Sequence, residues 1–591
     1  MTELARFDAL GSHGEGRSFV FSGLSGVVEA RTLDEVPQAF QEIEAALARG
    51  LFAAGYVAYE AAPACEPALA GKPPDKRLPL LRFALFSARH EAAAPLPPDA
   101  AGPFLLGPWQ PSLSAAAYGS AVERIRGWIA SGDTYQVNYT FRLRAAFAGD
   151  DSALYARLVQ AQRSAYCAHL RFGEVSILSL SPELFFRWQG DSLELRPMKG
   201  TRPRGRTPAE DDALAAELRG AEKDRAENVM IVDLLRSDAG RVAEPGSVAV
   251  PRLFEVERYE TVLQMTSTVR ARTRAGTRLW DLFQALFPSG SVTGAPKIRT
   301  ARLIAGLEDA PRGVYTGAVG FVSPGETVFN VAIRTLVLDR GAGTAELGIG
   351  SGITYDSAAG DEYRECLTKA EFTRPAVTEF RLLETLLWEP EEGFFLLQAH
   401  LRRMRESARR WGFAYDGEAV TGRLLAAVER QDSVQRVRLL LAMDGEIAVE
   451  SSPILRSAGP VCVALSADPV DSREPLLFHK TTRREIYERR AAAHPDCGEV
   501  LLFNERGELT ESTTANLVLQ LAGERFTPPL ASGLLPGVFR EELLRRGEIR
   551  ERMLRAEDLS RAEEIWLINS VRRWRRAVLG TFQGIAENGS A

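Results

Sequence analysis

The feature that most constrains the fold of this 591-residue chain is a break in its pattern at TRPAVTEF, residues 373–380. The segment contains a proline, carries no strong hydrophobic periodicity, and is followed by a new pattern of strands and helices. Domains commonly hold roughly 100–200 residues, and some are larger, so a chain of this length is expected to divide. We predict one domain over residues 1–373 and a second over residues 379–591.

Composition and charge place the chain among soluble globular proteins. Hydrophobic residues make up 45% and charged residues 25% of it, so large cores are available. The net charge of -6 gives no electrostatic reason to expect a nucleic-acid partner. The N-terminal segment MTELARFDALGSHGEG lacks the apolar core of a signal peptide, and no run of about 18 apolar residues is present. No membrane span is expected.

Cysteine usage predicts a reducing compartment. The five cysteines form neither a CxxC pair nor a metal-ligand spacing, and their number is odd. A reduced, cytoplasmic protein fits this pattern better than a disulfide framework does.

Hydrophobic spacing in the first domain changes between helical and strand patterns. Residues 135–147 alternate as a strand does, and residues 210–236 are strongly helical. Two apolar strands follow in VYTGAVGFVS and VFNVAIRTLVLD, and a helix over EYRECLTKAEF is expected to end near Phe372. A helix is also predicted over residues 115–131, with one apolar face formed by Tyr118, Val122, Ile125 and Ile129.

A single lysine stands out in LELRPMKGTRPRG, residues 193–205. A run with strand character ends at Pro197, and Lys199 follows, next to Gly200. A surface lysine beside a turn is one interpretation of this stretch. The other is a nucleophile, which requires that the ammonium group lose its proton through desolvation or a nearby cation.

Four glutamates offer acid–base or metal chemistry. Glu183 lies among apolar residues in LSLSPELFF, and burial would raise its pKa as a general acid requires. Glu227 lies on a predicted helix, and Glu362 and Glu365 share one face of another, with Lys369 four residues further on. Carboxylates converging from two helices would suit Mg²⁺. Taken singly, each also fits a solvated helix face or a turn cap.

Together these stretches resemble the chorismate-utilising enzymes over almost all of residues 1–373. The similar segments are GDTYQVN, SPELFF, PMKGTRPRG, KDRAENVMIVDLLRSD, PSGSVTGAPKIRT, VYTGAVGF, FNVAIRTL and GSGITYDSAAGDEYRECLTKAEF. Anthranilate and isochorismate synthases are similar but carry alanine where this chain has Lys199. A lysine there resembles aminodeoxychorismate synthase component I.

The resemblance implies a role for each residue of the motifs. Lys199 would attack C2 of chorismate, Glu183 would protonate the leaving 4-hydroxyl, and ammonia would then enter at C4. Relatives commonly have histidine where this chain has Gln264, which cannot relay a proton at neutral pH. Glu227, Glu362 and Glu365 would hold Mg²⁺, and the substrate would be bound by Ser291, Tyr315, Arg334, Lys369 and the backbone amides of Gly350 and Gly352.

No segment resembles a glutaminase, so ammonia is expected from solution or from a separate glutamine amidotransferase subunit.

Four motifs stand out in the second domain: QAHLRRMRESARRWGF, FHKTTRREIYERR, LLFNERGELTESTTANLVL and SGLLPGVFREELL. Taken singly, each can be interpreted as a basic helix face or a turn. Their order resembles the fold-type IV pyridoxal phosphate (PLP) enzymes, which include aminotransferases and aminodeoxychorismate lyase.

This second resemblance implies a PLP site. Lys480 would bind the cofactor covalently, and Glu511 would keep its pyridine nitrogen protonated. Thr385 would assist catalysis. Some members have a tyrosine five residues after the lysine, where this chain has Glu485, so that contact with the ring is not expected. The phosphate would be held by Arg403 and by backbone amides near Val538, Phe539 and Ser570.

The two resemblances together predict a bifunctional p-aminobenzoate synthase that serves folate synthesis. Three alternatives stay open: an aminotransferase in place of the lyase, an anthranilate synthase, and a scaffold that binds chorismate or tryptophan without turnover. The expected fold is an α+β domain of packed antiparallel sheets with outer helices, followed by a two-lobed α/β domain with a β-barrel-like sheet. A homodimer through the second domain is expected.

Overall fold

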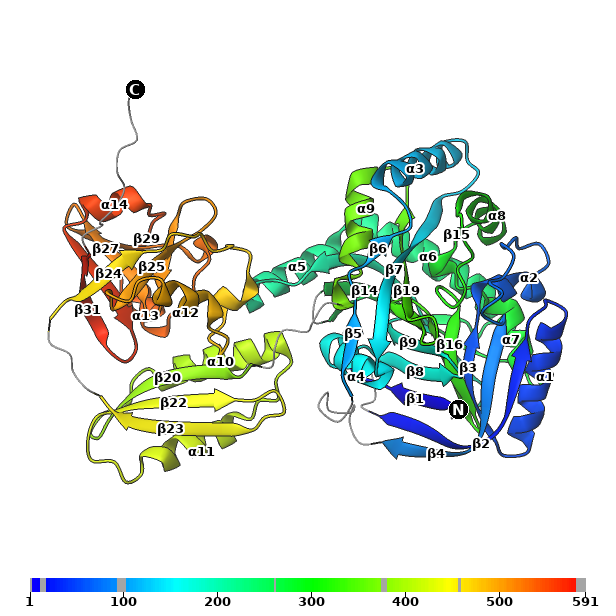
Figure 1. Cartoon of the computed structure of the whole chain (residues 1–591), viewed down its shortest axis with the longest axis horizontal. Helices are drawn as coiled ribbons and strands as arrows, with labels where there is room; N and C mark the ends of the chain where they lie inside the picture. Colours follow the sequence, from blue (N-terminus) through cyan, green and yellow to red (C-terminus); the bar gives the residue numbers. More distant parts are fainter. Residues whose placement is uncertain are drawn as a thin grey trace. The chain divides into compact units, whose positions relative to one another are not determined.

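The computed structural model describes residues 3–10, 17–92, 102–259, 262–373, 380–454 and 459–580. By contacts the chain forms two compact units, residues 1–204 with 214–376, and residues 205–213 with 377–591 (Figure 1). Most of the predicted boundary segment, residues 374–379, lies outside the described residues. In the described part, no helix is both long enough and apolar enough to span a membrane.

Antiparallel strands build the framework of the first unit. Strand β1 (Leu4–Asp8) pairs with both β2 (Ser18–Ala30) and β8 (Tyr166–Phe172), and so joins two series of strands. One series continues through β4 (Leu81–Ala92), β3 (Phe52–Val57), β16 (Ala318–Ser323), β17 (Glu326–Val331), β10 (Leu184–Gln189), β11 (Ser192–Arg196) and β14 (Val262–Arg272). The other continues through β9 (Val175–Ser181), β18 (Thr335–Asp339), β19 (Thr344–Ile353) and β7 (Gln136–Gly149).

Helices cover these strands and close the cores. One core packs α1 (Glu35–Ala48), α6 (Glu222–Gly240) and α7 (Leu279–Leu286) against the first series. A second packs α3 (Ala115–Ala130), α4 (Asp151–Gln162) and α9 (Ala359–Thr368) against the second. The predicted fold of packed antiparallel sheets with outer helices is therefore confirmed.

Helix α3 shows how the sequence dictates a local element. The Ser114 hydroxyl accepts a hydrogen bond from the Ala117 amide and caps the first turn. The predicted apolar face is present, because Tyr118, Val122 and Ile125 are buried. In strand β7 the predicted apolar side is buried, but Gln136, Thr140 and Arg142 on the other side are buried too, so burial alternates only from Leu143 onward.

The predicted helix over residues 210–236 is instead two helices. Helix α5 (Pro208–Gly220) ends before Ala221, and α6 begins at Glu222. Ala221 has the extended backbone of an N-cap residue. Gly220 has the lowest helix propensity apart from proline, which favours a break at this point.

The described residues of the second unit form two sheets. The smaller is antiparallel, in the order β21 (Gly393–Phe394), β20 (Leu382–Glu389), β22 (Gln435–Leu441) and β23 (Ile447–Pro453), and it packs on α10 (Leu397–Trp411) and α11 (Gly417–Val428) (Figure 1). The larger has eight strands, which include the short β28 (Glu524–Thr527) and β29 (Arg550–Glu551), and it mixes parallel and antiparallel pairs.

Six strands of the larger sheet form a closed ring. Strand β26 (Leu509–Ser512) pairs with β25 (Glu499–Phe503) on one side and with β27 (Asn516–Leu521) on the other. The ring continues through β30 (Glu564–Asn569), β31 (Arg573–Leu579) and β24 (Val461–Leu465) back to β25. The expected β-barrel-like sheet is therefore present.

Candidate active sites

Lys199 lies in an irregular part of a strand, not at the end of one. Strand β12 (Met198–Pro203) begins directly after Pro197 and pairs with β14. The register of this pairing shifts between Met198 and Thr201, so Lys199 and Gly200 form a bulge. The strand containing Leu193 and Leu195 ends before Pro197 as predicted, but a new strand carries Lys199, and its bulge directs the side chain without ending the sheet.

Gly200 and Gln264 hold the bulge in shape. Gly200 has a φ of 93°, which favours glycine, and a Cβ there would lie 3.0 Å from Asp224 Oδ1. The Gln264 amide nitrogen donates to the Gly200 carbonyl at 2.9 Å, and its carbonyl oxygen accepts from the Thr201 hydroxyl at 3.0 Å. Gln264 therefore contacts the Lys199 segment as a structural partner.

Charged groups from three elements surround the Lys199 ammonium. Burial is the main cause that lowers its pKa, while the charges of Glu227 and Glu183 oppose that shift. The nearby Lys369 ammonium lowers the Lys199 pKa further. The site therefore favours the neutral, nucleophilic amine more than water does.

Glu183 occupies the turn between β9 and β10. It is 3% exposed, and burial raises its pKa to about 7 although the Ser291 hydroxyl and the Lys199 charge act against the rise. A carboxyl with this pKa holds its proton in a substantial fraction of molecules near neutral pH. Ser291, predicted to bind substrate, lies against this carboxyl and hydrogen-bonds to Ser289 at 2.9 Å.

The backbone of strand β19 packs closely beside the Lys199 side chain. A Cβ at Gly352 would lie 3.3 Å from Lys199 Nζ and 2.1 Å from the Gln136 amide nitrogen, so only glycine allows this close approach. Gln136 is 2% exposed, and its side-chain oxygen Oε1 has no hydrogen-bond partner among the described residues. The sequence analysis missed Gln136, although it lies in the quoted segment GDTYQVN. An unpaired buried acceptor at this position is suited to a ligand donor.

The acidic residues of α9 lie at a more solvent-exposed edge of this site. Lys369 pairs with Glu365 at 2.9 Å and donates to the Gly350 carbonyl at 3.0 Å. Glu365 and Lys369 are exposed, while Glu362 and Glu227 are half-buried. Within the described ranges, no three metal-ligating side chains are gathered closely enough to hold an ion. The charge of Glu362 helps to raise the pKa of Glu227, so these two carboxyls are neighbours, and the Mg²⁺ site of Glu227, Glu362 and Glu365 stays a prediction.

Tyr315 and Arg334 are both placed by buried contacts. The Tyr315 ring packs on β19, since a Cβ at Gly348 would lie 2.1 Å from it. Arg334 has a φ of 48° and donates to the Gln162 side chain at 2.8 Å. Their contact with a substrate stays a prediction.

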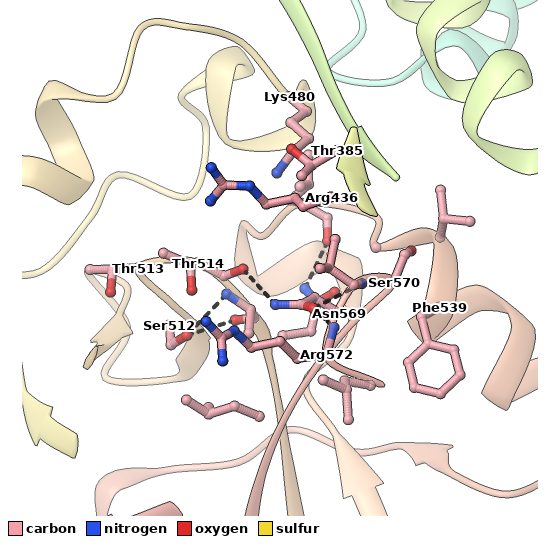
Figure 2. Close-up of a pocket in the computed structure, with 18 of the residues that line it drawn as sticks. Thr385, Arg436, Lys480, Ser512, Thr513, Thr514, Phe539, Asn569, Ser570 and Arg572 are labelled. Atoms are coloured by element: carbon pink, nitrogen blue, oxygen red, sulfur yellow. Dashed lines mark hydrogen bonds between the residues drawn. The ribbon is translucent and has the colours of Figure 1, made fainter. Parts of the chain in front are cut away.

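The second site is a cavity of about 750 Å³ in the second unit (Figure 2). This is large enough for a cofactor together with a small substrate. Its lining includes all of the predicted PLP-site residues: Thr385, Arg403, Lys480, Glu511, Val538, Phe539 and Ser570.

Lys480 is fixed by its backbone to the small sheet. Its carbonyl accepts from the Leu383 amide of β20 at 2.9 Å. Burial lowers the Lys480 pKa to about 8, and the positive charge of Arg403 contributes. The amine is therefore available as a nucleophile near neutral pH.

Glu511 lies on β26 and is held by three donors. Its oxygens accept from the Tyr487 hydroxyl at 2.8 Å, the Leu535 amide at 3.2 Å and the Asn516 side chain at 3.3 Å. Burial nevertheless raises its pKa to about 7. The sequence analysis considered Glu485 and missed Tyr487. Both residues lie on α12 (Glu485–Ala492), and Tyr487 lines the cavity.

A buried ion pair orients Arg403. Its guanidinium bonds both oxygens of Glu384, at 2.8 and 2.6 Å, and donates to the Pro536 carbonyl at 3.0 Å. His400 Nδ1 lies 2.6 Å from the same carboxyl, while its Nε2 is buried without a partner in the described part of the chain. Glu384 was also missed; the charges of Arg403 and His400 lower its pKa to about 2 against the effect of burial.

The phosphate end of the cavity combines a helix start and a hairpin turn. Helix α13 (Val538–Arg545) begins here, so the Val538 and Phe539 amides have no partner within the helix. The Asn569 side chain accepts from the Val571 and Arg572 amides and shapes the turn that carries Ser570 (Figure 2). With Arg403 and the unpaired His400 Nε2 close by, these groups fit a phosphorylated cofactor.

Comparison with known proteins identifies both parts of the chain. Residues 9–375 match the family model of chorismate binding enzymes, and residues 381–578 match that of amino-transferase class IV. Aminodeoxychorismate synthase of Streptomyces pristinaespiralis is 46% identical over 268 residues, which cover 45% of this chain and 37% of that protein. Aminodeoxychorismate synthase component 1 of Salmonella typhimurium is 41% identical over 262 residues, which cover 44% of this chain and 57% of that protein.

The matched segment thus spans about half or less of these curated relatives. Among solved structures, anthranilate synthase component I from Streptococcus pneumoniae is 27% identical, with a TM-score of 0.50 over 62% of this chain and 92% of that chain. The chorismate-binding match alone spans more than half of the residues. The chain therefore belongs to the family of chorismate binding enzymes, with an amino-transferase class IV domain following in its second part.

Proposed function

We propose that the first unit aminates chorismate to 4-amino-4-deoxychorismate, and that the second removes pyruvate from this product to give 4-aminobenzoate for folate synthesis. The observation that carries the proposal is the pairing of Lys199, whose pKa is lowered, with Glu183, whose pKa is raised. A neutral amine beside a protonated carboxyl is the arrangement that nucleophilic attack with general acid assistance needs.

In the first reaction, Lys199 Nζ forms a bond to C2 of chorismate while the bond from C4 to its hydroxyl breaks. Glu183 gives its proton to the departing oxygen, so water leaves. Ammonia then bonds to C4, and the lysine departs from C2. Ser291, Tyr315, Arg334, Lys369 and the Gly350 and Gly352 amides are proposed to bind the substrate, whose two carboxylates require cations and amide donors. Mg²⁺ binding stays a prediction.

In the second reaction, the class IV domain implies PLP, which supplies an electron sink when bound. Arg403 and the α13 and Ser570 amides hold its phosphate, and Glu511 holds a proton on its ring nitrogen. Lys480 removes the C4 proton of the substrate and returns a proton to the departing enolpyruvyl group, with Thr385 beside it in the cavity. Free ammonia, or a separate glutamine amidotransferase subunit, is proposed as the nitrogen source, and a homodimer through the second unit is proposed as the assembly.

Product analysis tests both halves of the proposal. The purified chain is incubated with chorismate, Mg²⁺, ammonium and PLP, and products are identified by mass and fluorescence. 4-Aminobenzoate and pyruvate in equal amounts are expected. Fluorescent anthranilate would overturn the first half, and accumulation of aminodeoxychorismate would leave an aminotransferase as the better assignment for the second unit.

The amination rate is expected to fall above pH about 7. Glu183 must be protonated to act as an acid, and its pKa is raised to about 7, so the rate declines as pH rises through that value. The pH dependence of kcat/KM for chorismate measures this limb. Replacing Glu183 by Gln should lower the rate by about 100-fold or more; a variant that keeps both the rate and the alkaline limb would refute the acid role.

Glu384→Gln is expected to weaken PLP binding and destabilise the second unit. The substitution leaves the Arg403 charge buried without its counter-ion, which costs roughly 3–5 kcal/mol. The lowered pKa of Glu384 means that the ion pair stabilises the fold fully above pH about 4.5 and ceases to do so as pH falls towards about 2. Cofactor titration by absorbance and thermal melting measure the two effects.

Glu446→Gln is the matched control for this prediction. It removes an ion pair with Arg381 in the same lobe, but the side chains of that pair are 63% and 44% exposed. Exposed pairs contribute little, so no change beyond about 1 kcal/mol is expected. Equal effects of the two substitutions would show that Glu384 does not position Arg403.

A further inference from the structure

The PLP cavity contains more cationic side chains than the cofactor uses. Arg403 and Lys480 have roles in cofactor binding, yet Arg436, Arg438 and Arg575 also line the cavity. The carboxylates in the lining do not balance them, since Glu511 is committed to the ring nitrogen. The other, Glu499, accepts hydrogen bonds from Ser512, Thr513 and Thr514. The substrate half of the cavity is therefore electropositive.

Strand β22 presents two of these arginines on one face. Val437 and Leu439 are buried in the core formed with α10 and α11, so the alternate residues Arg436 and Arg438 point to the opposite face. Arg438 lies directly across from Thr385 of β20 in the sheet register. Figure 2 shows Arg436 beside Thr385, on the side of the cavity that carries Lys480.

Arg575 approaches the cavity from the larger sheet. It lies on β31, opposite Leu567 of β30, and both residues line the cavity. The Arg575 Nε is buried and has no hydrogen-bond partner within the described ranges. A buried donor without an acceptor is costly, and a ligand carboxylate would satisfy it.

The β22 arginines are available to a ligand as well. Arg438 pairs with Glu450 at 3.3 Å, but the two side chains are 39% and 61% exposed, so the pair is weak. Arg436 is exposed to the cavity. Two positive subsites thus belong to two different sheets, and each can take one carboxylate.

We propose that these arginines make the second unit selective for dicarboxylate substrates, with Arg436 and Arg438 binding one carboxylate and Arg575 binding the other. The inference rests on the proposed function, because 4-amino-4-deoxychorismate carries one carboxylate on its ring and a second on its enolpyruvyl group. An amino acid with a single carboxylate satisfies only one subsite.

Three inert aromatic acids test the proposal by binding alone. The probe 3-(carboxymethoxy)benzoate carries both carboxylates, while benzoate and phenoxyacetate carry one each. Affinity for the PLP-loaded chain is measured by calorimetry and by the shift of the cofactor absorption band. Since a hydrogen bond between charged groups contributes about tenfold or more in affinity, the dicarboxylate should bind at least about tenfold more tightly than either monocarboxylate.

Substitutions assign the subsites. Arg436→Gln combined with Arg438→Gln should reduce the affinity for the dicarboxylate to that of one monocarboxylate, and leave the affinity for that acid unchanged. Arg575→Gln should have the same effect with the other monocarboxylate. Arg489→Gln is the control, because its side chain is 71% exposed and it does not line the cavity. Retention of the PLP absorption band shows that each variant is folded.

The result separates this inference from the proposed lyase reaction. Equal affinities for all three acids in the wild type, or equal losses for all three in each variant, would overturn the dicarboxylate selectivity. Selective binding of the dicarboxylate by a chain that releases no pyruvate would support the inference and reject only the lyase reaction, since the binding assay needs no turnover.

Discussion

Replacing Lys199 by Ala is expected to abolish formation of aminodeoxychorismate, with a loss of at least about 1,000-fold in rate. The amine is the attacking atom of the proposed reaction, so its removal leaves only binding and acid assistance. The alanine also recreates the residue found in the similar anthranilate synthases. Direct attack of ammonia at C2 is then open, and a slow switch to anthranilate is the one residual activity expected. Mass and fluorescence analysis of products from chorismate and ammonium measures both outcomes.

Lys297→Ala is a matched control for this substitution. Lys297 is a mostly buried lysine of the same unit, but it pairs with Asp238 at 2.6 Å and lies outside the Lys199 site. It should lower thermal stability and leave the identity of the product unchanged. A Lys199→Ala chain that still forms aminodeoxychorismate near the wild-type rate would refute the covalent mechanism and leave direct attack by ammonia at C4.

Replacing Lys480 by Ala is expected to stop release of pyruvate and to make aminodeoxychorismate accumulate. In the proposed reaction this residue is both the covalent anchor of PLP and the proton carrier, so a loss of at least about 10,000-fold is expected. The first reaction should continue at its wild-type rate, since Lys199 belongs to the other unit. Chromatography of the reaction mixture over time measures the accumulation, and absorbance after gel filtration measures retained cofactor.

Lys480→Arg separates the chemical role of this residue from its charge. The guanidinium keeps the positive charge that faces Glu511 and Glu384, but it cannot lose its proton or bind the cofactor covalently. It should therefore be as inactive as Lys480→Ala while keeping a more stable fold. Continued pyruvate release by both variants would assign the second reaction to another residue.

The chemical groups of both sites could be predicted from the sequence because they lie in short segments with restricted neighbours. Lys199 stands between Pro197 and Gly200, and Glu183 stands among apolar residues, so each signals its chemistry locally. The bulge that aims Lys199 could not be predicted. It depends on the register with β14, whose paired residues lie 59 to 68 positions away.

The alternation of buried residues along β20 could have identified Glu384 as a buried carboxylate. It falls in the same phase of β20 as Leu382 and Leu386, which are buried against α10. A carboxylate in a core-facing phase demands a cationic partner. The sequence contains Arg403 and His400 on the next helix, but only the packing of that helix on the strand shows that both reach the same carboxyl.

Tyr487 and Gln136 were out of reach for a different reason. Each gains its meaning from one atom of a distant segment, Glu511 in one case and the Gly352 backbone in the other. Predicting the fold class needed only the order of strands and helices. These contacts depend on which distant segments come together in the folded chain, and no local sequence pattern contains that information.

Closure of the six-stranded ring has a thermodynamic consequence. The pair of strands that closes it, β26 and β27, meets at Glu511 and Asn516, and Glu511 is also the group proposed to hold a proton on the cofactor ring. With Glu511 in its proposed role, cofactor release and opening of the ring are coupled equilibria: bound cofactor stabilises the second unit by an amount that grows with the logarithm of cofactor concentration, and the chain without cofactor lacks this stabilisation. The first unit has no such dependence through this residue, so the abundance of the two activities can diverge in one polypeptide.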